Sequence, residues 1–148
     1  MTLKSSKSRL YGLVGFPILH SLSPRMHNAA FAALKLKANY KLFEIKPGQL
    51  KNFLDTLVKK NICGFNVTYP FKEVILDYLS SKNLAVLGIG AVNTVLVEKS
   101  GKLKGFNTDY LGFIFDDPAK SQLYIIFWCF FTSPPCPPLL VRRGGNSL

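Results

Sequence analysis

The sequence predicts an α/β fold, a three-layer α/β/α arrangement with a mostly parallel sheet and a terminal β-hairpin. Strand-like and amphipathic helical segments alternate three times over residues 10–79, and such alternation is typical of a parallel sheet with helices on its faces. Two β-rich runs at 93–99 and 102–109 then follow each other across a short turn, which indicates a hairpin. Hydrophobic residues make up 48% and charged residues 18% of the chain, as expected for a folded globular protein.

The first strand–helix unit lies within residues 10–34. The run LYGLVGF at 10–16 predicts a buried strand. Ser23 and Pro24 then indicate a helix start, with Ser23 as N-cap and Pro24 as the first helical residue. Apolar residues follow at helical spacing and are expected to face the core: Met26, Ala29, Ala30, Ala33 and Leu34.

Two further units have the same design. The runs YKLFEI at 40–45 and CGFNVT at 63–68 predict the second and third strands. Helices are expected to begin at Pro47 and Phe71. The core stripe of the first is predicted to be Leu50, Phe53, Leu54, Leu57 and Val58. The core stripe of the second is predicted to be Val74, Ile75, Tyr78 and Leu79.

The hairpin has a predictable register, because loop length fixes which residues face each other. If residues 100 and 101 form a two-residue loop, Asn93 faces Thr108. Asp109 then lies beside Asn93 at the open end of the hairpin.

The alternation stops near residue 116. The segment that follows has no helical or strand period and contains the pairs Pro134-Pro135 and Pro137-Pro138. We therefore predict one domain over residues 8–115 and a poorly ordered tail over 116–148 that does not belong to it. The abrupt change of composition suits a frameshifted or read-through C-terminus, and an interaction tail is the alternative.

Charge and cysteine content limit the functional classes. Lys and Arg number 19 against 8 acidic residues, a formal charge of +11, which suits an anionic ligand or a nucleic acid. The lysines are spread out, with no basic stripe among stacking aromatics, so nucleic-acid binding is the weaker alternative. The three cysteines have no paired metal spacing, and we expect no metal and a reducing compartment.

Targeting signals are also informative. The N-terminal run MTLKSSKSRL lacks the apolar stretch of a signal peptide. The apolar run LYIIFWCFF at 123–131 is about half as long as a membrane span requires. We expect a cytoplasmic protein with no membrane partner.

Polar side chains cluster where the predicted strands end. Ligands of open α/β sheets bind beyond the carboxyl ends of the strands. If the first arm of the hairpin runs antiparallel to the earlier strands, these groups meet on one rim: Ser21 and Ser23, Thr68 and Lys72, Asn93 and Asp109. Hydroxyls, an amide, a lysine and a carboxylate suit a small, polyhydroxylated, anionic ligand.

Each of these residues also has a structural alternative. In this alternative, Lys72 is a solvated charge in the first turn of a helix, and Ser23 is a helix cap. Asn93 and Asp109 are then turn residues beside the hairpin, and Asn66 satisfies backbone groups at a strand end. His20 and His27 are expected to be structural. The run GIGAVN at 88–93 is not expected to bind a dinucleotide, because it precedes a strand and lacks the third glycine.

Four segments together resemble a known family. GFPILHSLSPRMHNAAF, GFNVTYPFKE, GIGAVNT and GFNTDYLGF stand in the order and spacing of the N-terminal substrate-binding domain of shikimate dehydrogenase. The resemblance covers about residues 10–115. It implies the reduction of 3-dehydroshikimate to shikimate with NADPH, a step of chorismate and aromatic amino-acid biosynthesis.

The resemblance also implies a role for each rim residue. Ser21 and Ser23 would bind the substrate carboxylate. Thr68, Asn93 and Asp109 would bind the ring hydroxyls. Lys72 would bind the substrate and act as the catalytic acid/base, paired with Asp109 as the second catalytic residue.

In one respect the chain departs from the family pattern. Family members continue into a Rossmann domain that binds NADP, whereas no glycine-rich turn follows a strand here. We expect a truncated chain, the substrate-binding half of an NADP-dependent enzyme, inactive alone and binding no NADP by itself. The alternatives are a non-catalytic shikimate- or quinate-binding module and an inert remnant.

Overall fold

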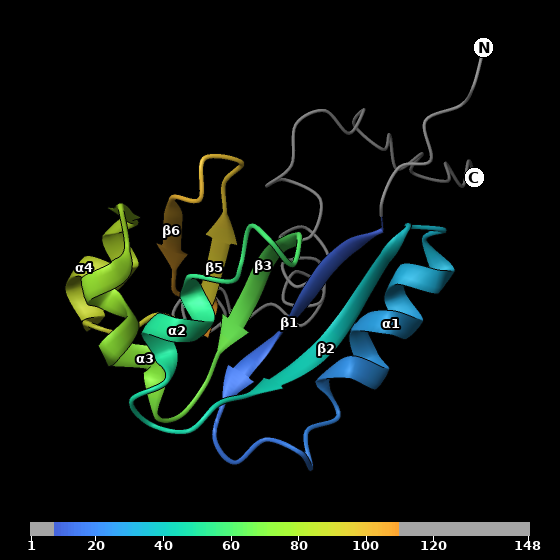
Figure 1. The fold of residues 1–148 in the computed structure, drawn as a ribbon, viewed down its shortest axis with the longest axis horizontal. Coiled ribbons are helices and arrows are strands. Elements are labelled where there is room, and N and C mark those ends of the chain that lie inside the picture. Colours follow the sequence, from blue (N-terminus) through green and yellow to red (C-terminus); the bar gives the residue numbers. More distant parts are fainter. Residues whose placement is uncertain (1–7, 110–148) are drawn as a thin grey trace, which may run out of the picture.

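A computed structural model describes residues 8–109 of the chain as a six-stranded sheet (Figure 1). The strands are β1 (Arg9–Gly15), β2 (Ala38–Glu44), β3 (Ile62–Val67), β4 (Ser81–Lys82), β5 (Thr94–Val97) and β6 (Leu103–Phe106). Their order in the sheet is β2-β1-β3-β5-β6-β4. Strands β2 and β3 both pair in parallel with β1, and β5 runs antiparallel to both β3 and β6. The predicted mostly parallel sheet with a terminal hairpin is confirmed.

Helices cover both faces of this sheet (Figure 1). They are α1 (Ser23–Ala33), α2 (Leu50–Leu54), α3 (Phe71–Val74) and α4 (Leu84–Ile89), and α3 continues into a 3₁₀ turn, η1 (Ile75–Tyr78). Strand β1 contributes side chains to two hydrophobic cores, one on each face of the sheet, because successive side chains of a strand point to opposite faces. Tyr11 packs with Phe31 of α1, whereas Val14 belongs to the core formed by α2, α3 and α4. The fold thus has the predicted three layers.

The buried face of α1 differs from the predicted stripe. Its buried residues are His27 and Phe31. The His27 ring stacks on Tyr40 of β2 at a centroid distance of 4.2 Å, and the Phe31 ring lies 5.7 Å from that of Tyr11. These large rings set the rotation of the helix about its axis. Ala30 is consequently only half-buried, and the other predicted core residues are exposed: Met26, Ala29, Ala33 and Leu34.

Helices α2 and α3 are shorter than predicted. The first begins at Leu50 and not at Pro47, and it ends at Leu54, so Val58 lies beyond it and is exposed. The second tightens after Val74 into η1, and three residues per turn shift the phase of the stripe. Ile75 is therefore buried as predicted, whereas Val74 and Tyr78 are exposed.

The hairpin register is one residue away from the predicted one. Thr94 lies opposite Phe106, where a two-residue loop would place it opposite residue 107. The observed loop spans residues 99–101 and is closed by a hydrogen bond of 2.9 Å from the Gly101 N–H to the Glu98 carbonyl. Gly101 has a φ of 84°, which glycine adopts without strain. Three-residue loops with a left-handed third residue are common in hairpins, and the sequence prediction used the shorter loop.

Two elements were not predicted, β4 and α4. Helix α4 is delimited by its caps: the Asn83 side chain accepts from the Val86 N–H at 3.0 Å, and Gly90 ends the helix with a φ of 72°. An N-capping asparagine and a left-handed glycine are recognisable helix boundaries. The helix is only six residues long, which leaves little periodic signal between them.

Two further observations concern the part of the chain that the structure describes. No helix within residues 8–109 is long and apolar enough to cross a membrane. The same residues contain no group of three or more His, Cys, Asp or Glu side chains that could hold a metal ion. The predicted tail at 116–148, and residues 110–115 of the predicted domain, lie outside the described residues.

The buried His27 makes folding stability depend on pH. Burial lowers the pKa of its imidazole from the ordinary value of 6.5, so the unfolded chain binds the proton more readily than the folded one. The stabilisation is therefore present above the unfolded pKa and is lost as the pH falls through the lowered folded pKa. We expect the free energy of unfolding, measured in urea, to fall between about pH 7.5 and about pH 5.5.

The variant His27→Phe keeps a ring for stacking on Tyr40 but removes the titrating group, and should reduce this pH dependence. His20→Ala, which removes an exposed histidine, is the control and should retain it. An unchanged pH dependence in His27→Phe would contradict the assignment.

Candidate ligand-binding site

The carboxyl-terminal edge of the sheet gathers the predicted site residues. Because β1 and β3 are adjacent and parallel, the segments that follow them lie at the same edge. Strand β5 is antiparallel to β3, so Asn93, which precedes β5, lies at this edge too. Strand β6 in turn is antiparallel to β5, which brings the residues after it, including Asp109, to the same place. The condition set for the rim, a first hairpin arm antiparallel to the earlier strands, is thus met.

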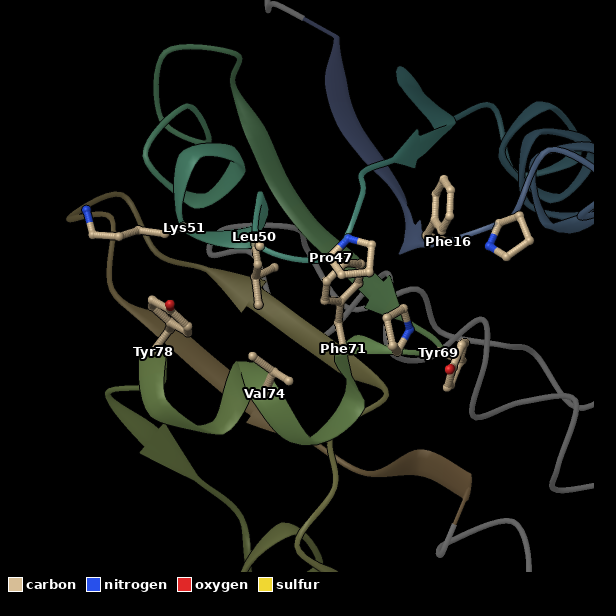
Figure 2. Close-up of a pocket in the computed structure, with 11 residues that line it drawn as sticks. Phe16, Pro47, Leu50, Lys51, Tyr69, Phe71, Val74 and Tyr78 are labelled. Carbon is tan, nitrogen blue, oxygen red and sulfur yellow. The ribbon is translucent and has the colours of Figure 1, made fainter.

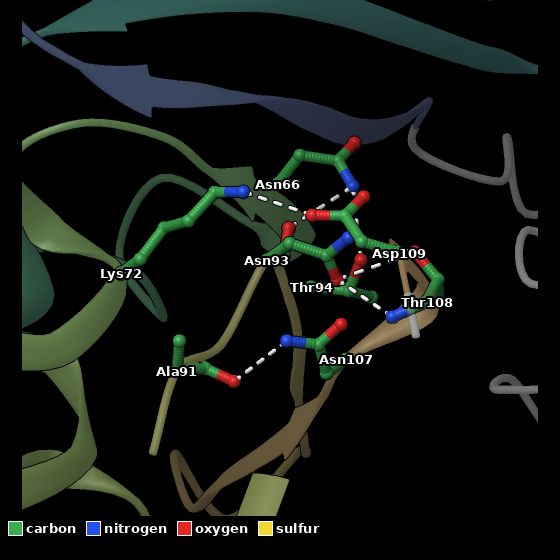
Figure 3. Close-up of polar contacts among 8 residues, drawn as sticks. All are labelled: Asn66, Lys72, Ala91, Asn93, Thr94, Asn107, Thr108 and Asp109. Carbon is green, nitrogen blue, oxygen red and sulfur yellow. Dashed lines mark hydrogen bonds and ion pairs between the residues drawn. The ribbon is translucent and has the colours of Figure 1, made fainter. Parts of the chain in front are cut away.

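Lys72 and Asp109 form an ion pair at this rim (Figure 3). The Lys72 Nζ lies 2.8 Å from the Asp109 Oδ2, and the two side chains are 40% and 63% exposed. The Lys72 carbonyl also accepts a hydrogen bond of 2.8 Å from the Val92 N–H, which joins α3 to the segment before β5. Exposed ion pairs contribute little to stability. The pair therefore orients the ammonium group more than it supports the fold.

Asn93 holds the segment that carries Asp109. Its side chain is 8% exposed. The Nδ2 donates to the Thr108 Oγ1 at 2.9 Å, and the Oδ1 accepts from the Thr108 N–H at 3.0 Å. The structural role considered for Asn93, fixing the flank of the hairpin, is therefore present. The same contacts set the position of Asp109 relative to Lys72 (Figure 3).

A buried polar network behind the rim was only partly predicted. The Asn66 Nδ2 donates to the Asn93 carbonyl at 3.3 Å and to the Thr94 Oγ1 at 3.1 Å, which agrees with the expected satisfaction of strand-end backbone. The Asn66 Oδ1 accepts from the Tyr40 hydroxyl at 2.7 Å. Tyr40 and Thr94 were missed because both resemble ordinary core residues of strands. The available signal was that a buried tyrosine hydroxyl requires a polar partner.

The serines form a pair of their own. The Ser21 Oγ donates to the Ser23 Oγ at 3.0 Å and accepts from the Ser23 N–H at 3.2 Å. Ser23 is the first residue of α1 and not its cap, because Leu22 occupies the cap position without a side-chain hydrogen bond. This corrects the prediction: the hydroxyl that accepts from the start of the helix is that of Ser21. Within residues 8–109, no hydrogen bond links the serine pair to Lys72 or Asp109.

Thr68 follows β3 and packs closely against the end of β1. Its N–H donates to the Val14 carbonyl at 2.9 Å, and its carbonyl accepts from the Phe71 N–H at 2.9 Å. A Cβ at Gly15 would collide with the Thr68 methyl group, so glycine permits this approach. The Thr68 hydroxyl has no hydrogen-bond partner among the described residues, which leaves it available to a ligand.

The run at 88–93 does not form a dinucleotide-binding turn. It contains the end of α4, where Gly90 is left-handed, and it leads into β5. The Asn107 Nδ2 donates a hydrogen bond of 2.9 Å to the Ala91 carbonyl. A pyrophosphate-binding turn joins a strand to a helix N-terminus, and within residues 8–109 no glycine-rich segment has that arrangement. The described residues therefore contain no turn of the kind that holds the pyrophosphate of NADP.

An apolar groove of about 470 Å³ lies at the same edge of the sheet (Figure 2). It is formed by the segments that follow β1, β2 and β3, and its lining includes Phe16, Pro47, Leu50, Phe71, Val74 and Tyr78. None of the six predicted site residues lines it. We assign the candidate site to the polar rim, because a polyhydroxylated anion requires hydrogen-bonding and charged groups.

Comparison with protein families matches residues 13–95 to the family described as "Shikimate dehydrogenase substrate binding domain". A "Shikimate dehydrogenase (NADP(+))" of Bacillus anthracis is 52% identical over 106 residues, covering 72% of this chain and 38% of the relative. Another, of Dehalococcoides mccartyi, is 45% identical over 112 residues, covering 76% of this chain and 39% of the relative. The chain thus spans about two fifths of the length of these relatives.

Solved structures are similar over the same region. Shikimate dehydrogenase from Aquifex aeolicus has a TM-score of 0.70 and 43% identity, covering 76% of this chain and 42% of that one. The enzyme from Thermus thermophilus, solved in complex with NADP(H) and shikimate, has a TM-score of 0.67 and 38% identity. That match covers 72% of this chain and 40% of the solved one.

Proposed function

We propose, from the premise that this chain belongs to the family of shikimate dehydrogenase substrate-binding domains, that its polar rim binds shikimate and 3-dehydroshikimate. The observation that carries the proposal is the 2.8 Å pair of Lys72 and Asp109, with hydroxyl and amide groups at the same edge of the sheet. In an assembly that supplies NADPH, the chain is the substrate half of a shikimate dehydrogenase. By itself it binds without turnover.

The hydrogen-bonding groups of the rim suit a hydroxylated ring carrying a carboxylate. The Ser21 Oγ donates to the Ser23 Oγ at 3.0 Å, and rotation of the Ser21 hydroxyl away from Ser23 would give two adjacent donors for the two oxygens of a carboxylate. The Thr68 hydroxyl is available for a ring hydroxyl. Asn93 and Asp109 supply an amide and a carboxylate, which bind further hydroxyls.

Lys72 is the proposed acid/base. When a ketone is reduced, its oxygen develops negative charge and needs a proton, so a fixed donor at that oxygen stabilises the transition state. Asp109 accepts from the Lys72 ammonium and thereby limits the positions that the ammonium samples. Lys72 then holds its proton where the reacting oxygen of the substrate lies.

Titration of shikimate into the purified chain tests the proposal. Saturable changes in amide chemical shifts near Ser21, Thr68 and Asn93 are expected. Cyclohexanecarboxylate, which lacks the ring hydroxyls, is the control ligand and should bind far more weakly, because it leaves hydroxyl-binding groups unpaired. A folded chain that shows no saturable response to shikimate would overturn the proposal.

Ser21→Ala is predicted to weaken shikimate binding by about 1–3 kcal/mol, the range for a hydrogen bond to a charged group. Titration calorimetry would measure the change. Ser100→Ala, at the tip of the hairpin, is the matched control and should bind like the wild type. An unchanged dissociation constant in Ser21→Ala would exclude Ser21 from the carboxylate site.

A second candidate function is a shikimate- or quinate-binding module that takes part in no reaction. It is favoured by the lack, within the described residues, of a turn of the kind that holds the pyrophosphate of NADP. The two functions differ in their response to a cofactor-binding partner. Consumption of NADPH after adding the part of a relative that follows its matched segment supports the enzyme half, whereas ligand binding without any turnover supports the module.

A further inference from the structure

Glu44, the last residue of β2, binds the loop that carries Ser21 and Ser23 through its side-chain carboxylate. Its Oε2 accepts from the Ile18 N–H at 2.7 Å and from the Leu19 N–H at 3.1 Å. Gly15, the last residue of β1, is paired with Glu44 across the two strands. The carboxylate therefore stands beside the point where the chain leaves the sheet and turns toward Ser21.

Hydrogen bonds continue from this contact to both serines. The Ile18 carbonyl accepts from the Ser21 N–H at 2.9 Å, and the Ser21 Oγ contacts the N–H and the Oγ of Ser23. Glu44 thus fixes the Ile18 N–H, and the carbonyl of the same residue fixes Ser21. A hydrogen bond to an ionised acceptor is roughly twice as strong as a neutral one.

Hydrophobic packing anchors this loop near its start, through Phe16 and Ile18, and not near the serines. Ile18 is buried, but Leu19 and Leu22 are 75% and 67% exposed. The positions of Ser21 and Ser23 consequently depend on polar contacts. Each of the three ion pairs in the described part of the chain joins a carboxylate to a lysine. Glu44 belongs to none of them, and its carboxylate accepts hydrogen bonds from two backbone N–H groups.

We propose that Glu44 is a positioning residue that holds loop 16–22 so that Ser21 and Ser23 face the carboxylate of the ligand. This inference rests on the proposed function, because it assigns Glu44 to the carboxylate end of that same site. Glu44 acts through the serine pair and does not touch the ligand. Removing it should therefore matter only while the serine pair is intact.

The test uses the full chain and the variants Glu44→Ala, Glu44→Gln and Glu98→Ala. Glu98 accepts from Lys104 in the hairpin, so its variant is the matched loss of a carboxylate away from the loop. Without ligand, Glu44→Ala should shift the Ile18 and Leu19 amide resonances and speed their hydrogen exchange. Glu44→Gln, whose amide oxygen still accepts, should change them less. If the Ile18 and Leu19 amide resonances and exchange rates are unchanged in Glu44→Ala, Glu44 does not hold the loop and the proposal is overturned.

A double-mutant cycle with Ser21→Ala then connects the contact between Glu44 and the loop to the ligand. Glu44→Ala should weaken shikimate binding by about tenfold in the wild-type background, and by less than about twofold when Ser21 is already alanine. Equal losses in both backgrounds would overturn the proposal, because Glu44 would then act independently of the serines. If the wild-type chain does not bind shikimate, the proposed function fails. Amide exchange in Glu44→Ala then still decides whether Glu44 holds loop 16–22.

Discussion

Lys72→Ala should lower turnover by about 10²–10⁴-fold, the usual contribution of a general acid/base, and change shikimate affinity only a few-fold. The assay uses a chimera, for example residues 1–109 joined to the part of the Bacillus anthracis relative that follows its matched segment. Alanine removes the ammonium that Asp109 orients at 2.8 Å. The other groups proposed to bind the substrate remain. Steady-state rates and ligand titration of the same chimera would separate the two effects.

The chain contains a closely matched control for this experiment. The Lys104 Nζ lies 2.7 Å from the Glu98 Oε1, and its side chain is 44% exposed, against 40% for Lys72. Lys104→Ala therefore removes an equivalent paired lysine away from the rim and should leave turnover unchanged. If Lys72→Ala keeps its rate within a few-fold of the parent chimera, Lys72 is not the acid/base.

Phe65→Ala should reduce the free energy of unfolding by about 3–5 kcal/mol, as for other fully buried aromatic residues. Phe65 is 0% exposed, and its ring meets that of Phe53 edge-on at 5.7 Å. It lies in β3, between β1 and β5, and β3 leads to Thr68 and Lys72 of the rim. The cavity left by alanine therefore weakens the packing of α2 against the sheet.

Urea denaturation monitored by circular dichroism would measure this loss. Leu84→Ala truncates a large apolar residue that is 86% exposed, and it should change stability little. A loss in Phe65→Ala no larger than that in Leu84→Ala would mean that the core collapses around the cavity or is packed differently.

The strands and the rim could be predicted because both follow from topology. Once β1 and β3 are parallel neighbours, the carboxyl-end rule brings the segments with Thr68 and Lys72 to one edge. The placement of Lys72 and Asp109 on one rim follows from that rule and from the orientation of β5, whereas their pairing was expected only from the family resemblance. No detailed packing is needed for the inference of that placement, which is why it succeeded from sequence.

Features that depend on local geometry were predicted less well. The hairpin register depends on the positive φ of Gly101, and two loop lengths suited the same residues. The rotation of α1 depends on the stacking of His27 on Tyr40, and histidine was not counted as a core residue. Glu44 was missed because its hydrogen-bond partners are backbone N–H groups, which every residue except proline has and which therefore give no signal in a sequence.

The rim is assembled from segments that are synthesised far apart in time. The hydrogen bond between Lys72 and Asp109 spans 37 positions, and the serines precede Asp109 by a still longer stretch of chain. Contacts of such separation form late, because their loops must close first. A chain still emerging from the ribosome has β1, β2 and β3 available well before Asp109 appears. The proposed ligand, whose site includes Asp109, would therefore stabilise the finished domain without assisting the early steps of its folding.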